Sequence, residues 1–155
     1  MQERTLIIVK PDAIQRHLAG EIISRFEKKG FKLVAAKFMQ ISKALAEQHY
    51  AAHRGKPFFE PVVKYLSSSP SLVMVWEADK VIEMARTLMG PTFSFEAPAG
   101  TIRGDLSSSG RYNLVHGSDS PESARYEIDL YFKPEEMVSY KLADEDWLYC
   151  KTVQC

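Results

Sequence analysis

The chain has 155 residues, 45% of them hydrophobic and 26% charged, and its 20 Lys and Arg residues balance its 20 Asp and Glu residues. Length and composition fit a single domain, which we expect over residues 1–155 with a short tail from about residue 148. A domain of this size can form a hydrophobic core without added cross-links. The formal net charge of zero makes nucleic acid an unlikely partner, because proteins that hold it mainly by its phosphates are basic, so any phosphate affinity must come from a local cluster of cations.

The first part of the chain predicts two strands with a helix between them. Residues 5–9 form a continuous apolar run, which is typical of a strand buried on both faces. Pro11 disfavours the helical conformation at Lys10, so Lys10 is expected at the end of that strand. Residues 20–29 have the periodicity of a helix that Gly30 can end, and residues 32–38 predict the second strand.

The middle of the chain predicts three helices and a third strand. Ser42 can cap a helix that reaches about residue 53, and residues 57–66 favour another short helix. Residues 72–77 predict a strand. Asp79 can cap the helix that follows it, which Gly90 and Pro91 end.

Residues 92–111 show no strong periodicity, and an aperiodic segment of about twenty residues is unusual in a compact domain unless it is functional. Residues 112–116 predict a short fourth strand, and Ser120 can cap a final helix that begins at Pro121. Beneath the extra helices the order of elements is βαββαβ. That order predicts an α+β sandwich of the ferredoxin-like class, in which helices cover one face of a four-stranded, mainly antiparallel sheet.

The sequence carries no membrane or targeting signal. No run of about 18 or more apolar residues occurs, and the first apolar run, residues 6–9, is too short for a signal peptide. We therefore expect a cytoplasmic protein with no membrane partner. Cys150 and Cys155 lie at the extreme C-terminus, where we favour two free thiols over a local disulfide. No His or Cys pattern in the sequence has the spacing of zinc ligands.

Residues 113–120, Asn-Leu-Val-His-Gly-Ser-Asp-Ser, place a histidine where a strand meets the start of a helix. The chain has no P-loop, no dinucleotide-binding glycine turn and no protein-kinase signature. Gly117 leaves space beside the ring of His116, and the polar run after it leads into a helix N-terminus that suits anions. Such an imidazole can be a covalent nucleophile, although a lone histidine is more often structural.

Other polar residues could complete a phosphoryl-transfer site. Glu127 lies two turns into the last helix, where it faces either solvent or His116, whose tautomer a carboxylate would fix. Arginine grips phosphate with a forked guanidinium, so Arg86 and Arg103 are candidates, although a surface role is the default for each. Thr92 could donate a hydroxyl to phosphate or serve only in the turn that it occupies.

A third group of residues could hold a nucleobase. Tyr50 and His53 offer polar donors, and two phenylalanines, Phe58 and Phe59, follow the rigid Pro57. An exposed aromatic ring can stack on any base. The alternative is that both phenylalanines belong to the core, which we expect for at least one of them.

Taken together, these segments resemble the nucleoside diphosphate kinase family from about residue 5 to residue 147. The likeness rests most on four segments in the expected order, which are residues 10–12, 57–59, 100–105 and 113–120. The resemblance implies a ferredoxin-like core assembled into homo-hexamers or tetramers. It also implies a ping-pong exchange between nucleoside triphosphates and diphosphates through a phosphohistidine. The cofactor would be Mg²⁺, held mainly by the nucleotide phosphates rather than by protein side chains.

The resemblance also implies a role for individual residues. His116 would be the nucleophile and Glu127 its orienting partner, with Lys10 as the third catalytic residue. Val62 would lie beside the base. The nucleotide would be bound by a larger set that holds sugar, phosphates and base: Lys10, Tyr50, His53, Phe58, Arg86, Thr92, Arg103 and Asn113.

The chain departs from the family pattern in three places. Ala13 and His17 stand where the family usually has glycine, and we expect small local changes of the backbone there. Residues 92–99 replace the family's usual Thr-Asn-Pro-Ala stretch and bring in Phe93 and Phe95, which we expect in a subunit contact rather than in the loop's own packing. The chain also runs past the usual end near Tyr149.

A rival hypothesis is a catalytically silent nucleotide-binding or protein-interaction module on the same fold. Fold alone does not separate it from a phosphotransferase. The distinguishing feature is the complete set His116, Lys10, Arg103, Asn113 and Glu127, because a silent relative is expected to have lost part of it.

Overall fold

The computed structural model describes residues 2–150 and contains one four-stranded sheet in the order β2-β3-β1-β4. The strands are β1 (Gln2–Val9), β2 (Lys32–Met39), β3 (Ser71–Asp79) and β4 (Val115–Gly117). Every neighbouring pair runs antiparallel, and β1 lies between β3 and β4. This is the predicted ferredoxin-like α+β arrangement.

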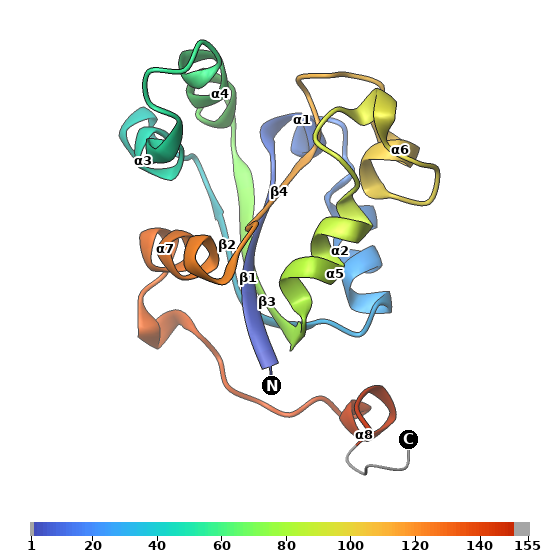
Figure 1. The fold of residues 1–155 in the computed structure, drawn as a ribbon. Helices are drawn as coiled ribbons and strands as arrows, with labels where there is room; N and C mark the ends of the chain where they lie inside the picture. Colours follow the sequence, from blue (N-terminus) through green and yellow to red (C-terminus); the bar gives the residue numbers. More distant parts are fainter. Residues whose placement is uncertain (1, 151–155) are drawn as a thin grey trace.

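Helices cover both faces of the sheet, so the expectation of one covered face is wrong. On one side lie α2 (Ala19–Lys28) and α5 (Val81–Met89), and on the other lie α3 (Lys43–His49), α4 (Phe59–Leu66) and α7 (Pro121–Tyr131), as Figure 1 shows. Alternate residues of β1 enter two separate hydrophobic cores: Ile7 and Val9 enter the first, and Leu6 and Ile8 the second. The continuous apolar run of β1 is the sequence signature of this burial on both faces.

Several helix boundaries follow from local chemistry. The Ser42 hydroxyl accepts a hydrogen bond from the Leu45 amide at 3.1 Å, and Ser120 caps α7 with Pro121 in its first turn, as predicted. Asp79 does not cap α5, because β3 continues to Asp79 and Lys80 is the N-cap residue, with φ of 52°. The helix expected to reach residue 53 divides into α3 and a 3-10 turn at Ala51–His53.

The predicted aperiodic segment contains two short elements, η2 (Ser94–Glu96) and α6 (Ile102–Leu106). The fourth strand is shorter than the predicted 112–116, because Leu114 adopts a positive φ of 70° and the Val115 amide turns back to the Asn113 carbonyl at 2.8 Å. This three-residue turn ends at Val115, where β4 begins one residue before His116. A short helix, α1 (Pro11–Gln15), also follows β1 without having been predicted.

The C-terminal segment crosses below the sheet in Figure 1, from α7 through η3 (Pro134–Glu136) to α8 (Glu145–Leu148) near α2. Tyr149 packs against the core that α2 and α5 share. Cys150 is disulfide-bonded, so the favoured free thiol is wrong at this position, while Cys155 lies outside the described residues. Within residues 2–150, the helices are too short or too polar to cross a bilayer.

Candidate active site

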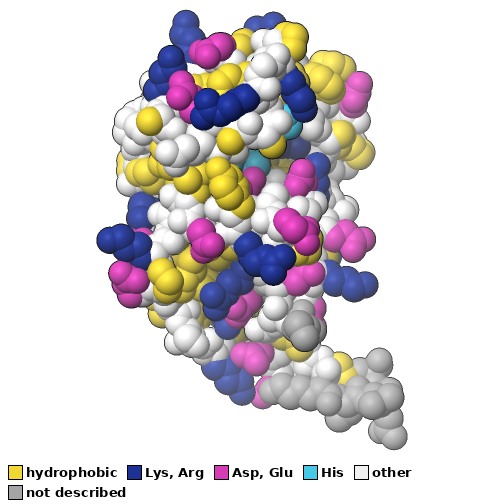
Figure 2. All heavy atoms as spheres, turned by 60° about the vertical axis from the view of Figure 1, so that its left-hand side comes forward, with side chains coloured by type: hydrophobic (Ala, Val, Ile, Leu, Met, Phe, Trp, Pro, Cys, Tyr) yellow, Lys and Arg dark blue, Asp and Glu magenta, His cyan; other side chains and the backbone are white. Residues whose placement is uncertain are grey.

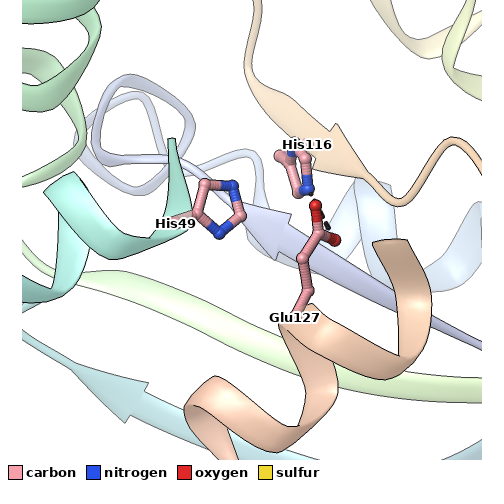
Figure 3. A group of neighbouring side chains, drawn as sticks. All are labelled: His49, His116 and Glu127. Atoms are coloured by element: carbon pink, nitrogen blue, oxygen red, sulfur yellow. Dashed lines mark hydrogen bonds and ion pairs between the residues drawn. The ribbon is translucent and has the colours of Figure 1, made fainter. Parts of the chain in front are cut away.

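His116 on β4 and Glu127 on α7 face each other beneath the short strand (Figure 3). The Nε2 atom of His116 lies 3.0 Å from Oε2 of Glu127. The same carboxylate oxygen accepts a hydrogen bond of 2.6 Å from the Ser118 hydroxyl, which in turn accepts one from the Leu6 amide. Glu127 is buried and held from two sides, so it is not the solvated helix residue that was its alternative.

This contact determines which nitrogen of His116 is nucleophilic. A carboxylate accepts a hydrogen bond, so Glu127 favours the neutral tautomer with the proton on Nε2. The lone pair then lies on Nδ1, at the far side of the ring from Glu127. Because the His116 side chain is partly exposed, with 19% of its surface accessible, the nucleophilic nitrogen can meet a substrate. The arrangement is suited to covalent catalysis.

His49 packs edge-on against His116, with ring centroids 4.4 Å apart. It is buried and also contacts the rings of Tyr50 and Tyr131. Burial lowers the pKa of His49 well below its usual range, and the nearby His116 lowers it further. His49 was not among the site residues predicted from the sequence, because nothing in the local pattern shows which strand its helix will meet.

A second group of side chains joins the end of β1 to the turn before β4. Lys10 Nζ donates to Oδ1 of Asn113 at 2.9 Å, and the Asn113 amide donates to the Thr92 carbonyl at 3.0 Å. Arg103 Nε donates to the Asn113 carbonyl at 3.1 Å. These contacts bring together four of the residues proposed to bind the nucleotide, although they are far apart in the sequence.

Two buried cations occur together in this group. Burial lowers the pKa of Lys10 to about 7, with a further contribution from the charge of Arg103. Burial also lowers the pKa of Arg103 to about 10, and Arg86 adds to the effect. Positive charges that are costly to hold without an anion mark a site where a bound anion is favourable.

The two arginines are engaged to different degrees. Besides its contact with Asn113, Arg103 donates to the Gly90 carbonyl at 2.8 Å and to the Val115 carbonyl at 2.7 Å. Some of the N–H donors of its guanidinium therefore remain available to a ligand. Arg86 on α5 makes one long contact of 3.4 Å with the Gly117 carbonyl. Arg86 is therefore largely available to a phosphate.

Phe58 and Phe59 have opposite environments. Phe59 is buried in the core, as expected for at least one of the pair, whereas 46% of the Phe58 surface is exposed. The Phe58 ring lies 5.2 Å from the His53 ring and 5.6 Å from Lys56 Nζ. Phe58 is thus available for stacking on a base.

Figure 2 shows histidine side chains in a hollow in the upper half of the molecular face drawn there, with Lys and Arg side chains near the hollow.

Known proteins are similar to this chain in both sequence and fold. The family model for nucleoside diphosphate kinase matches residues 3–137. The chain belongs to the nucleoside diphosphate kinase family. A family member from Carboxydothermus hydrogenoformans is 56% identical over 147 residues, which cover 95% of this chain and 99% of that protein.

Two solved members of the nucleoside diphosphate kinase family have the same fold. The enzyme from Halobacterium salinarum, in complex with CDP, is 43% identical with a TM-score of 0.93, over 96% of this chain and 99% of its own. The enzyme from Borrelia burgdorferi, a transition-state mimic with bound vanadate and ADP, is 37% identical with a TM-score of 0.89, over 94% of this chain and 96% of its own.

Tyr50 and Thr92, which the family resemblance also implied, lie beside the groups formed around His116 and around Lys10. Tyr50 is partly buried between the rings of His49 and His53. Burial raises the pKa of Tyr50, and the charge of Glu127 raises it further, so this phenol stays neutral beside the site. Thr92 is exposed and enters the network through its carbonyl, which leaves its side chain on the surface of the loop.

Asp12 and Tyr65 support the site without having been singled out from the sequence. The Tyr65 hydroxyl donates to one oxygen of the Asp12 carboxylate, and the other oxygen accepts from the Leu114 amide at 3.2 Å. Leu114 is strained, because a left-handed conformation costs a non-glycine residue about 1–2 kcal/mol. Asp12 therefore holds the strained turn that presents His116. The motif at residues 10–12 contained this signal.

His17 is the second position where the family usually has glycine, and it adopts a φ of 58°. Glycine reaches this conformation without a steric penalty, whereas histidine does so at some cost. A glycine at this position would therefore adopt the observed backbone with less strain than His17.

The buried Lys10 predicts a pH dependence of stability. Its pKa is about 7 in the folded chain and about 10.4 in an unfolded one, so between these values the unfolded chain binds more protons. The free energy of unfolding of the wild type should therefore rise by about 2–3 kcal/mol relative to Lys10→Met between about pH 7 and about pH 9. Urea titrations at both pH values measure this difference. The exposed Lys43→Met is the control, and equal slopes for the wild type and Lys10→Met would contradict the assignment.

Proposed function

We propose that the chain transfers the γ-phosphoryl group of a nucleoside triphosphate to a nucleoside diphosphate through a phosphohistidine at His116. Nδ1 of His116 attacks the γ-phosphorus, and the bond from that phosphorus to the bridging oxygen breaks, so the departing diphosphate takes the electron pair. A second diphosphate then attacks the phosphohistidine with a terminal oxygen of its β-phosphate and restores neutral His116. The observation that carries this proposal is the 3.0 Å contact of Nε2 with Glu127.

The side chains around His116 have complementary roles in this proposal. Charge on the transferred phosphoryl group is spread over its oxygens, so the site must supply donors and cations in fixed positions. Arg86, Arg103 and Thr92 would hold the phosphates, with Tyr50 and His53 nearby. Lys10 and Asn113 would bind the sugar hydroxyls, because the Nζ–Oδ1 contact of 2.9 Å places a donor and an amide side by side.

Mg²⁺ enters this proposal with the nucleotide. The ion prefers oxygen ligands in octahedral geometry. The two carboxylates that hold His116 and the turn before it are already engaged, Glu127 by His116 and Ser118, and Asp12 by Tyr65 and the Leu114 amide. We therefore place Mg²⁺ on the phosphates of the substrate, where it would neutralise charge. We also place the enzyme in the cytoplasm, where its nucleotide substrates occur.

The two half-reactions test this function. Protein incubated with γ-labelled ATP and Mg²⁺, then freed of nucleotide by gel filtration, should carry label and pass it to GDP or CDP without further ATP. Initial rates should give parallel double-reciprocal lines, as ping-pong exchange does. Label that reaches a diphosphate only while ATP is present would indicate direct transfer, and the absence of any transfer would favour the silent nucleotide-binding module.

Phe58→Ala should weaken the binding of purine and pyrimidine diphosphates alike, by roughly 1–3 kcal/mol, because stacking carries little base specificity. Calorimetric titration with ADP, GDP and CDP measures the loss. Tyr140→Ala, at an aromatic ring of similar exposure in the C-terminal segment, is the control and should bind as the wild type does. A large loss for one base only would show that Phe58 belongs to a base-specific pocket.

We further propose that the chain forms a homo-hexamer or homo-tetramer in which Phe93 and Phe95 contact a neighbouring subunit. Their surfaces are 50% and 68% exposed, and their rings stack on each other with centroids 5.7 Å apart. Internal packing of the loop therefore leaves much of both rings in contact with water. A fully buried phenylalanine contributes roughly 1.5–3 kcal/mol, so a subunit that covers this pair would gain from it.

The double change Phe93→Ser and Phe95→Ser should lower the assembly state or make the melting temperature more dependent on protein concentration. Chemistry within each subunit should survive, because Thr92 and Arg103 are unchanged. Light scattering and melts over about a hundredfold range of concentration measure both effects. Phe58→Ser removes a phenylalanine ring that is 46% exposed and should leave assembly unchanged. A monomeric wild type, or a double variant that assembles and melts like it, would refute the contact.

A further inference from the structure

His49, His116 and Glu127 form a compact group of metal-ligating atoms. One ligand atom from each lies within 4.8 Å of the other two, and within residues 2–150 this is the one set of three His, Cys, Asp or Glu side chains with such geometry. Figure 3 shows the three side chains converging from α3, β4 and α7. They are far apart in the sequence, which is why no zinc-ligand spacing is visible there.

The group differs from an ordinary surface cluster because two of its members are buried and one nitrogen of His49 lacks a hydrogen-bond partner. His49 and Glu127 are each 7% exposed. The Nδ1 atom of His49 is buried without a hydrogen-bond partner. A buried polar atom without a partner is costly, and a ligand that engages the ring would remove that cost. His49 can thus turn toward a metal ion without giving up a hydrogen bond at Nδ1.

The donor set selects a particular class of ion. Two imidazoles and one carboxylate suit Zn²⁺ and similar borderline divalent ions, which bind these ligands at about 2.0–2.2 Å, whereas Mg²⁺ prefers oxygen alone. Two ligands of one tetrahedral ion lie about 3.3 Å apart at those bond lengths. The contact of 3.0 Å between His116 and Glu127 is close to this, and His49 needs only a modest movement.

We propose that His49, His116 and Glu127 bind Zn²⁺ or a similar divalent ion, and that this ion blocks phosphorylation of His116. A metal on Nε2 of His116 replaces the proton there, and in the neutral ring that proton moves to Nδ1 through solvent. Nδ1 then has no lone pair for the γ-phosphorus. Glu127 exchanges its hydrogen bond from His116 for a metal–oxygen bond. The inhibition rests on the proposed function, whereas the binding of the metal does not.

Binding is tested first, without nucleotide, by calorimetric titration of the full chain with Zn²⁺ in the absence of reductant. We expect one Zn²⁺ per wild-type chain and at least tenfold weaker binding by His49→Phe, which keeps a ring against His116 but lacks nitrogen. His17→Asn removes a histidine outside the group and should bind as the wild type does. Melting curves without metal confirm that the variants fold, and His49→Gln provides a second variant of that position. Absence of stoichiometric binding, or equal binding by the His49 variants, would overturn the site.

Inhibition is tested next by mixing the zinc-loaded protein, freed of unbound zinc, with ATP and excess Mg²⁺ for a single turnover. The metal-free protein should gain a phosphoryl group under the same conditions, and the zinc-loaded protein should not. Phosphorylation of both at equal rates would overturn the inhibition. Failure of the metal-free protein would instead contradict the proposed function, so the two failures are distinguishable.

Discussion

Replacing His116 with alanine is expected to reduce phosphoryl transfer by about 10⁴-fold or more while the protein still folds and binds ADP. Loss of a covalent nucleophile has effects of this order, because the remaining groups position the substrate without supplying the bond. Glu127 keeps its hydrogen bond from Ser118 in the variant, so the carboxylate is not left without a partner.

Neighbouring hydroxyls are not placed to replace the imidazole. The Ser118 hydroxyl is buried between Glu127 and the Leu6 amide, and the Ser120 hydroxyl caps α7. Steady-state exchange assays and calorimetric titration with ADP measure the two parts of the prediction. Substantial exchange by His116→Ala, with contaminating enzyme excluded, would end the phosphohistidine mechanism.

Arg103→Ala should be the most damaging change outside the nucleophile, because it affects stability and transfer together. Its guanidinium donates to the carbonyls of Gly90, Asn113 and Val115 from a buried position. Removing it takes this donor away from the Gly90 and Val115 carbonyls, whereas the Asn113 carbonyl keeps its hydrogen bond from the Val115 amide. Each unsatisfied buried group costs about 1–3 kcal/mol. We expect the free energy of unfolding to fall by roughly 2–5 kcal/mol.

Arg86→Ala is the matched control for Arg103→Ala. Arg86 makes a single contact of 3.4 Å, so its loss should lower transfer while the free energy of unfolding changes by less than about 1 kcal/mol. Urea titrations and transfer assays on both variants separate the two roles. Equal stability of the two variants would show that the three carbonyl contacts contribute little to the fold.

The fold was predictable from sequence as far as local patterns specify it. The apolar run of β1, the Ser42 cap and the Ser120-Pro121 start of α7 each rest on interactions within a few residues. The second covered face was missed, because the apolar stripe of a helix shows that it is buried without showing against which side of the sheet. The run of residues 5–9 already contained that information.

The site was predictable where short motifs carry it and not where tertiary contacts create it. His116, Lys10, Asn113 and Arg103 come from motifs, and the structure brings the last three into one hydrogen-bonded network. His49 meets His116 only because α3 packs on the face of the sheet where His116 lies beside its strand partner Ile8. The positive φ of Leu114 depends on the distant Asp12 carboxylate, so no local propensity predicts it.

The central claim is that His116 carries the phosphoryl group, and an intact-mass spectrum after mixing with ATP and Mg²⁺ tests it most directly. We predict one added phosphoryl group per chain, which disappears in His116→Ala. The adduct should be lost in acid and persist in base, as expected for a phosphorus–nitrogen bond. An unmodified mass, an adduct that remains in His116→Ala, or an adduct stable to acid would contradict the account.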